Sequence, residues 1–250
     1  MLLLTASTTF LAWLFKALER ATLPGIIQHY AKRKRTIERE VLTRLQSSAF
    51  SSVYILGAGF DTLALRIAAN YPEVQFVELD HPATQAVKKL ALADQALPAN
   101  FEFSACDLRT APVAQLFAEL SPGQAQANLK NRLVIAEGLL MYFTPAQVQA
   151  LLTAALAAES PGPNNNVCIF SYMEQTDSLP ARFRPRSWLI DRWLAFKNEP
   201  FLWSANSTEL AEVVTHAGGK IERLISSINF GDNVSADAIR GENLVVASST

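Results

Sequence analysis

The sequence predicts a single α/β domain in which helices cover both faces of a mostly parallel sheet. Along the 250 residues, short apolar segments with strand character alternate with segments of helical periodicity. One such strand, residues 53–56, runs directly into the turn Gly57-Ala58-Gly59. Acidic residues lie at or just after the ends of the next three predicted strands, which places polar groups along the edge where parallel sheets bind ligands.

Composition and charge narrow the class of protein. Half of the residues are hydrophobic and 18% are charged, which is typical of a folded globular chain. The formal net charge of −1 gives no reason to expect a nucleic-acid partner. Cys106 and Cys168 are isolated thiols without zinc-site spacing. We therefore expect a cytoplasmic protein with no metal site.

The N-terminus is apolar but short. Residues 1–15 are rich in Leu, Phe and Trp, and Lys16 interrupts them before they could span a bilayer. The positive charge that precedes the core of a signal peptide is missing. Phe10, Leu14 and Leu18 recur at helical spacing, so we expect an amphipathic helix packed on the domain and no stable membrane insertion.

A second helix is predicted over residues 27–45, after a Pro-Gly pair. It carries four adjacent basic residues, 32–35, which point in different directions around a helix, so at most two of them can face one ligand. The simplest interpretation is a solvated face with pairs four residues apart, such as Lys34 with Glu38.

The alternation of strands and helices follows in order. The predicted strands are residues 53–56, 74–80, 101–105, 132–138, 167–172, 221–225 and 243–247. The predicted helices are residues 62–70, 83–96 and 113–120, one that Pro145 opens, and 208–217. We expect helices in 1–47, a cofactor-binding half in 52–158 and an acceptor-side half in 166–250, with 174–203 as a possible lid.

Four strand ends mark the candidate binding site. Gly57 and Gly59 follow the first strand, and glycine lets the chain turn sharply and approach a ligand closely. Asp80 and Glu137 lie at the ends of the second and fourth predicted strands, and Asp107 follows the third. A single acid in such a place is often only a helix cap, but successive ones along one edge indicate a cleft. Asp80 is placed to accept hydrogen bonds from ribose hydroxyls, and Asp107 lies near an adenine edge.

The residues around these positions resemble the leucine carboxyl methyltransferase family, which groups protein C-terminal carboxyl methyltransferases with bacterial polyketide O-methyltransferases. The resemblance covers roughly residues 28–157, in the family's order and spacing. The segments that carry it are Leu56-Gly57-Ala58-Gly59-Phe60-Asp61-Thr62, Glu78-Leu79-Asp80-His81-Pro82, Asp107-Leu108-Arg109 and Ala136-Glu137-Gly138-Leu139-Leu140-Met141-Tyr142-Phe143-Thr144-Pro145.

The resemblance implies a class I methyltransferase, Rossmann-like sandwich: a seven-stranded, mostly parallel sheet whose last strand is antiparallel, with helices on both faces and an N-terminal helical extension. It implies S-adenosylmethionine as cofactor and S-adenosylhomocysteine as product. The residues that would contact the cofactor are Arg33, Gly57, Gly59, Asp80, Asp107, Leu108 and Glu137. Arg33 is similar to the family arginine that binds the methionine carboxylate, and Glu137 would face the methionine amino group. The glycines would pass under the methionine part, Asp80 would hold the ribose, and Asp107 with the following leucine would frame the adenine.

The acceptor must be argued from the residues, because the resemblance ends before the segment expected to bind it. A carboxylate acceptor is already ionised, whereas a phenol or alcohol benefits from a base. His29, one turn before Arg33, is the candidate base, and Tyr142 is a candidate pocket residue or an ordinary core residue. Aromatic and basic residues in 180–203 predict a small, anionic, partly aromatic acceptor, unless these aromatics only cover the sheet.

Two other functions are compatible with parts of the pattern. A Rossmann-type NAD-dependent oxidoreductase shares the strand, the glycine turn and the acid of the second strand, but Thr62 occupies its third glycine position. A non-catalytic cofactor-binding scaffold is the second alternative, against which the intact acids at the strand ends argue. The oligomeric state is left open.

Overall fold

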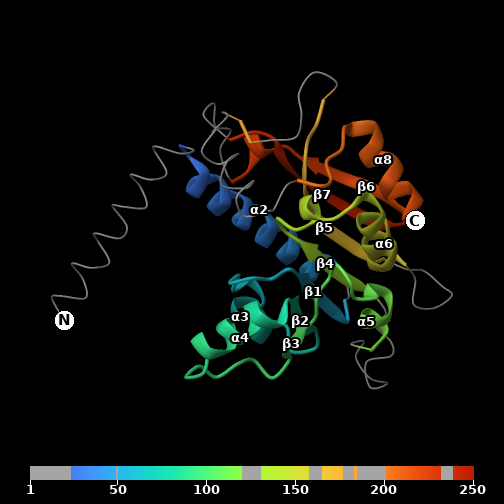
Figure 1. Cartoon of the computed structure of the whole chain (residues 1–250). Coiled ribbons are helices and arrows are strands. Elements are labelled where there is room, and N and C mark those ends of the chain that lie inside the picture. Colours follow the sequence, from blue (N-terminus) through green and yellow to red (C-terminus); the bar gives the residue numbers. More distant parts are fainter. Residues whose placement is uncertain are drawn as a thin grey trace.

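The computed structural model describes residues 24–48, 50–119, 131–157, 165–176, 183–184, 201–231 and 239–250. Seven strands form one sheet in the order β3-β2-β1-β4-β5-β7-β6 (Figure 1). The pairs among β1 to β5 are parallel, and β7 is antiparallel to both of its neighbours. The predicted seven-stranded, mostly parallel sheet with an antiparallel last strand is confirmed.

The first half of the sheet is built by short strand–helix units. Its strands are β1 (Ser52–Leu56), β2 (Gln75–Asp80), β3 (Phe101–Ala105) and β4 (Arg132–Ala136). Its helices are α3 (Leu63–Ile67) with the 3-10 turn η1 (Ala68–Asn70), α4 (Pro82–Ala91), α5 (Val113–Glu119) and α6 (Pro145–Leu156). Helix α4 is shorter than predicted, because the backbone leaves the helical conformation at Leu92, which has φ −104° and ψ 6°.

The second half begins with β5 (Val167–Met173) and continues with α8 (Ser207–His216), β6 (Gly219–Ile225), the 3-10 turn η4 (Ser227–Asn229) and β7 (Glu242–Ser249). Trp203 is buried and its ring lies 6.3 Å from that of Tyr172, so this aromatic belongs to the core. The expected amphipathic helix around Phe10 to Leu18 and most of the expected lid lie outside the described residues.

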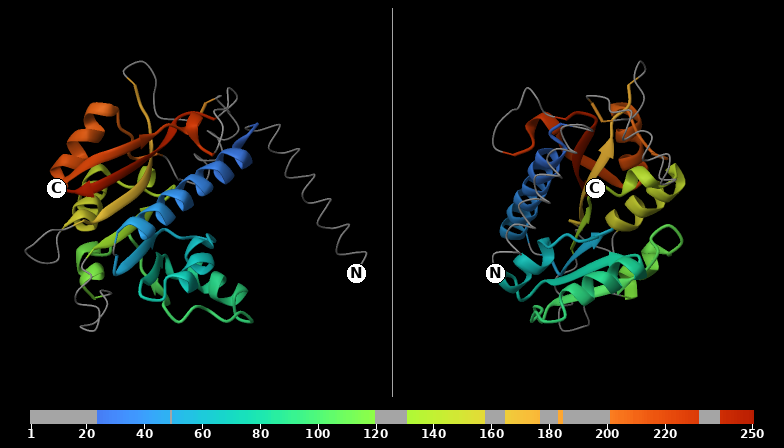
Figure 2. Two further views of the ribbon diagram at one scale, coloured as in Figure 1. Left: turned by 180° about the vertical axis from the view of Figure 1, so that it is seen from behind. Right: turned by 60° about the vertical axis from the view of Figure 1, so that its left-hand side comes forward.

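Helices cover the two faces of the sheet in separate groups, because alternate residues of a strand point to opposite faces. Val53 and Ile55 of β1 pack with Ile37 of α2 (Ile26–Ser47) and with α3. Tyr54 and Leu56 pack in the other core layer, with α5, α6 and α8. Figure 2 shows α2 and α3 on one side of the sheet and α6 and α8 on the other.

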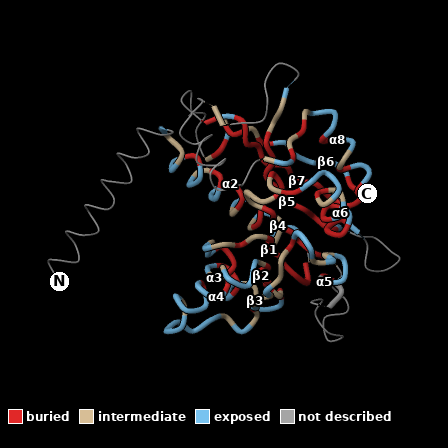
Figure 3. Tube along the Cα trace, in the orientation of Figure 1, coloured by how far each residue is buried: buried red, intermediate tan, exposed pale blue. Residues whose placement is uncertain are grey.

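The central strands are buried throughout, whereas much of α4 and the loop after it is exposed (Figure 3). Strands β1, β4 and β5 have every residue buried, as expected for parallel strands covered on both faces. Within the described ranges, no helix combines the length and the apolarity needed to cross a membrane. The order of the strands reverses between β1 and β4, and α/β sheets bind ligands at such a switch point.

Candidate cofactor site

A cavity of about 590 Å³ lies at the carboxyl ends of the strands, within the range of small-molecule sites. Residues of β1, β2, β3 and the segment after β4 contribute to it. Its lining consists of Gly57, Asp80, His81, Asp107, Leu108, Arg109, Leu139, Tyr142, Phe143, Thr144, Gln147 and Leu202. The fold therefore brings five residues from the predicted set, Gly57, Asp80, Asp107, Leu108 and Tyr142, to one cavity.

The glycine turn after β1 has a backbone that other residues rarely adopt. Gly57 and Gly59 have φ angles of 62° and 52°. A Cβ on Gly57 would lie 2.8 Å from a methyl carbon of Leu139, so a side chain there would crowd the cavity wall. The amide of Gly57 donates to the carbonyl of Leu79 at 2.8 Å, which fixes the turn against β2. The turn therefore leaves bare backbone at the cavity, as a closely approaching ligand requires.

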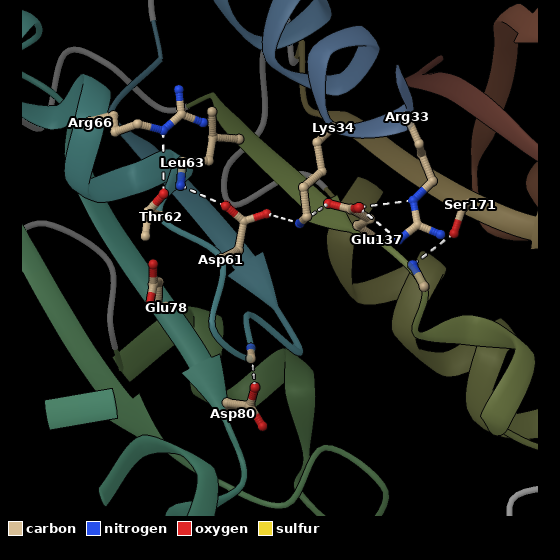
Figure 4. Close-up of polar contacts among 12 residues, drawn as sticks. Arg33, Lys34, Asp61, Thr62, Leu63, Arg66, Glu78, Asp80, Glu137 and Ser171 are labelled. Atoms are coloured by element: carbon tan, nitrogen blue, oxygen red, sulfur yellow. Dashed lines mark hydrogen bonds and ion pairs between the residues drawn. The ribbon is translucent and has the colours of Figure 1, made fainter. Parts of the chain in front are cut away.

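Asp80 joins this turn to the end of β2. One carboxylate oxygen accepts the amide of Gly59 at 2.5 Å, a bond that Figure 4 shows, and the other accepts the amide of His81 at 2.5 Å. Each carboxylate oxygen can accept more than one hydrogen bond, so Asp80 keeps capacity for hydroxyl donors on the cavity side. The imidazole of His81 accepts the amide of Ala83 at 3.2 Å and caps α4.

The end of β3 supplies an apolar and a polar group together. Leu108 is buried at the cavity, and Asp107 accepts the amide of Arg109 at 3.0 Å. That bond and the one from the Arg109 side chain lower the pKa of Asp107, so it stays ionised at neutral pH. Leu139 and Phe143 supply further apolar wall. A carboxylate for hydroxyls, an apolar slot and bare glycine backbone fit the adenosine part of the implied cofactor.

The side chain of Arg33 extends from α2 to the end of β4. Arg33 is not among the residues that line the cavity. Its Nε donates to Glu137 at 2.8 Å (Figure 4), and its Nη1 donates to Glu242 on β7. The guanidinium carbon lies 4.8 Å from the centre of the Tyr30 ring. Burial alone would lower the pKa of Arg33, but the charges of Glu242 and Glu137 raise it, so the guanidinium remains charged.

The backbone beyond Glu137 leaves room for this guanidinium. Gly138 has a φ of 63°, and a Cβ there would lie 3.4 Å from Nη2 of Arg33. The Gly138 amide donates to the hydroxyl of Ser171 on β5 at 2.7 Å, which fixes the turn after β4. Arg33, Glu137 and Gly59 were also predicted to contact the cofactor. Within the described part of the chain they do not line the cavity, but they lie at the strand ends next to it.

Lys34 is not paired within its own helix, which corrects the interpretation of the basic run. Its Nζ contacts the carboxylate of Asp61 and lies 3.2 Å from Glu137, although the side chain is 46% exposed. Glu38, the expected partner, pairs with Arg66 of α3 at 2.5 Å. Helix α2 crosses the sheet beside the glycine turn, so neighbouring strand-end acids are closer partners than the next turn of the helix (Figure 1).

Glu242 is a site residue that sequence reasoning missed. Its side chain is fully buried, and it contacts both Arg33 and, at 2.9 Å, Nε2 of His29. Burial would raise the pKa of Glu242, but the charge of Arg33 and the bonds from His29 and Arg33 lower it to about 2. A charged residue at the start of an otherwise apolar strand was the only available signal. His29, the candidate base, is buried with Glu242, and the cavity lining among the described residues does not include it.

A row of aromatic rings leads from the cavity toward α2. Tyr142 lines the cavity, and its ring centre lies 5.9 Å from that of Phe201. Phe201 lies 6.1 Å from Phe183, which lies 5.9 Å from His29. Of the aromatics in the predicted acceptor segment, Phe183 and Phe201 join this row, while Trp188, Trp193 and Phe196 lie outside the described residues.

Several solved structures share this fold, among them a methyltransferase. The magnesium protoporphyrin IX methyltransferase (ChlM) from Synechocystis PCC 6803, solved with bound SAH, is 10% identical, with a TM-score of 0.53 over 89% of this chain and 84% of that one. The pyocyanin biosynthetic protein PhzM is 14% identical, with a TM-score of 0.52 over 94% of this chain. LaPhzM is 16% identical, with a TM-score of 0.52 over 88% of this chain. The matched region spans 62% of PhzM and 55% of LaPhzM.

The comparison with family models identifies the chain more specifically than its fold. No curated protein sequence matches it significantly. The model described as leucine carboxyl methyltransferase matches residues 4–156, which is more than half of the chain and includes α2 and the ends of β1 to β4. The resemblance argued from the strand-end motifs is confirmed. The chain belongs to the leucine carboxyl methyltransferase family, and its cofactor is S-adenosylmethionine.

Proposed function

We propose that this protein transfers a methyl group from S-adenosylmethionine to an oxygen, a carboxylate or a hydroxyl, of a small, anionic, partly aromatic molecule. One observation carries the proposal: Gly57, Asp80 and Asp107 line one cavity, and Arg33 and Glu137 lie at the next strand end. We further propose that residues 1–250 form a single methyltransferase domain. The two free cysteines support a cytoplasmic location.

The roles of the binding residues follow from their chemistry. Asp80 would accept hydrogen bonds from the ribose hydroxyls, and Asp107 with Leu108 would hold the adenine. Arg33 would bind the methionine carboxylate through donors of its planar fork, and Glu137 would accept from the amino group. The cofactor supplies an electrophilic methyl group, which the acceptor oxygen takes as the carbon–sulfur bond breaks and its electron pair stays on sulfur. The chain contributes mainly proximity and orientation.

The position of His29, the predicted base, favours a carboxylate as the acceptor group. His29 is held by Glu242 and lies outside the cavity lining among the described residues, so its position does not support a base at the cavity. An ionised acceptor needs no base. The rings of Tyr142 and Phe201 offer flat apolar surface beside the cavity, which supports an acceptor with an aromatic part. We propose that residues 174–203 complete the acceptor pocket as a lid.

Hydride transfer is the weaker alternative. Dinucleotide-binding folds have six parallel strands in the order 3-2-1-4-5-6, whereas here an antiparallel β7 lies between β5 and β6. The family match also favours methyl transfer. The scaffold alternative requires a functional test, because a protein can bind a cofactor and lack an acceptor.

Calorimetric titration tests the cofactor assignment. We expect S-adenosylmethionine and S-adenosylhomocysteine to bind with dissociation constants in the micromolar range and NAD not to bind. Asp80→Ala should weaken S-adenosylhomocysteine by roughly 1.5–3 kcal/mol, because charge-assisted hydrogen bonds to the ribose are lost. The matched control is Asp94→Ala, at an exposed position after α4. Tighter binding of NAD, or unchanged binding by a folded Asp80→Ala variant, would contradict the assignment.

Transfer of a labelled methyl group tests the reaction. The protein is incubated with methyl-labelled S-adenosylmethionine and pools of aromatic carboxylic acids, phenols and aliphatic acids. Base-labile label in the aromatic acid pool is expected, because methyl esters hydrolyse in base and aryl ethers do not. Label in the phenol pool that resists base would indicate hydroxyl methylation instead. Cofactor binding without transfer to any pool would support the scaffold alternative.

A further inference from the structure

Glu242 is buried at a junction that the family match does not reach. The match ends at residue 156, whereas Glu242 is the first residue of β7. Its carboxylate binds Arg33 and His29, which lie one turn apart on α2. Through both bonds, the face of α2 that points to the sheet is connected to β7, the antiparallel strand of the second half. The contact therefore links the helix that carries Arg33 to a part of the fold outside the shared motifs.

The geometry limits how Arg33 can move. Glu137 accepts from Nε and lies 2.7 Å from Nη2, while Glu242 accepts from Nη1. Two carboxylates thus hold two edges of one planar group, and the Tyr30 ring lies over the guanidinium. A flexible arginine has several rotamers of similar energy, so the contacts that remove those rotamers decide where its remaining donor points.

Charge supports the same interpretation. Near the end of β4, the cations Arg33 and Lys34 contact three carboxylates, those of Asp61, Glu137 and Glu242. If Glu242 were absent, Arg33 would keep only Glu137, the acid expected to face the amino group of the ligand. Glu242 thus allows Glu137 to interact with a ligand without leaving the guanidinium unpaired in a buried place.

We propose that Glu242 is a positioning residue, which holds Arg33 and, through His29, the first turns of α2 in the orientation that binds the amino-acid end of the cofactor. The inference rests on the proposed function, because it assigns the methionine carboxylate to Arg33. It adds a residue of the second half of the fold to the cofactor site. It also gives His29 a role in orienting Glu242 and not in proton transfer.

The test compares two ligands that differ only at the amino-acid end. S-adenosylhomocysteine carries that end, and 5′-methylthioadenosine has the same adenosine and sulfur without it. Glu242→Gln keeps the shape and removes the charge. We expect the dissociation constant of S-adenosylhomocysteine to rise about tenfold, as for loss of one charged hydrogen bond, and that of 5′-methylthioadenosine to change less than twofold. Glu242→Asp keeps the charge with a shorter reach, so it should restore part of the affinity.

Glu40 provides the matched control. It is a buried carboxylate on α2 that accepts from the more exposed Arg223 of β6 at 2.5 Å, so Glu40→Gln changes another link between this helix and the second half of the sheet. This variant should leave the affinity ratio of the two ligands unchanged. An unchanged ratio in folded Glu242→Gln, or an equal loss of both ligands, would overturn the inference. So would failure of both Glu242 variants to fold when Glu40→Gln folds, because Glu242 would then serve the fold. If the wild-type protein does not bind S-adenosylhomocysteine, the proposed function fails instead.

Discussion

Arg33 and Lys88 are two buried cations beside the same glycine turn, and they differ in how their charge is matched. Lys88, on α4, binds Glu78 of β2 at 2.5 Å and the backbone carbonyl of Asp61. One cation meets one carboxylate, and the side chains are 4% and 1% exposed. Arg33 meets two carboxylates, Glu137 directly after β4 and Glu242 of β7, and the side chains of Arg33 and Glu137 are 10% and 11% exposed.

Both cations are buried, so burial alone does not separate a structural ion pair from one suited to binding. The two groups differ in the number of carboxylates that surround the cation and in the remaining exposure of the side chains. The Lys88 pair is closed and neutral, so it can only support the turn from behind. The Arg33 group has a surplus of acid and partial exposure, so it can exchange contacts with a ligand. The predictions below test this distinction, from the largest expected effect to the smallest.

Lys88→Met should lower the free energy of unfolding by roughly 3–5 kcal/mol, because a buried carboxylate loses its partner. Urea denaturation measures the loss. The control is Lys89→Met, the neighbouring lysine, which is exposed and should change stability by less than about 0.5 kcal/mol. Equal stability of the two variants would mean that the Lys88 pair does not support the fold.

The two buried acids should respond to pH in opposite directions. The pKa of Glu242 is lowered to about 2, so its contribution to stability is complete above the ordinary value of 4.5 and is lost as the pH falls toward 2. On that basis the loss is on the order of 3 kcal/mol. Burial raises the pKa of Glu78 against the opposing effect of Lys88, so its contribution falls as the pH rises through the ordinary value.

Unfolding free energies of the wild type, Glu242→Gln and Glu78→Gln between pH 6 and pH 2 test this pair of signs. The advantage of the wild type over Glu242→Gln should shrink as the pH falls. Relative to Glu78→Gln, the wild type should gain stability over the same change. Parallel curves for all three proteins would show that neither acid has a shifted pKa.

Arg33→Lys should weaken S-adenosylhomocysteine by roughly 1.5–2 kcal/mol, because an ammonium group cannot replace the planar fork. The exposed Arg39→Lys change on the same helix is the control. Calorimetry measures both affinities. If the two variants bind equally well, the acid-rich group around Arg33 is structural, as the Lys88 pair is.

Lys34→Ala should have the smallest effect. The lysine is nearly half exposed, and its bonds to Asp61 and Glu137 are screened by solvent, so we expect at most about 1 kcal/mol in stability and less in ligand affinity. An effect on binding as large as that of Arg33→Lys would indicate a diffuse basic surface in place of a specific arginine.

Local features made most of the fold and half of the site predictable. The end of a strand and the residue after it are adjacent in sequence, and a parallel sheet collects such ends at one edge. Gly57, Asp80 and Asp107 could therefore be placed together from the residues alone, whereas Leu108 was placed by family resemblance. Arg33 was placed by family resemblance, because nothing in a run of four basic residues distinguishes the one that points inward.

Contacts between distant segments could not be predicted in this way. Arg33 and Glu242 are 209 residues apart, and Lys34 and Asp61 are 27 apart on different elements. Their pairing depends on the angle at which α2 crosses the sheet, which helical periodicity does not contain. Trp203 was ambiguous for a related reason, since its apolar ring suits a pocket or a core, and only its packing on Tyr172 distinguishes them.

The position of β7 has a consequence for how the molecule is made. It is the last strand in the chain, yet it lies inside the sheet, between β5 and β6. On the ribosome, the glycine turn and the strand-end acids emerge long before this strand, while β5 waits with an open edge that another chain could pair with. The pair between Arg33 and Glu242 also cannot form before β7 has been synthesised. On the proposed role of Glu242, the part of the cofactor site that binds the amino-acid end is therefore complete only after β7 has joined the sheet.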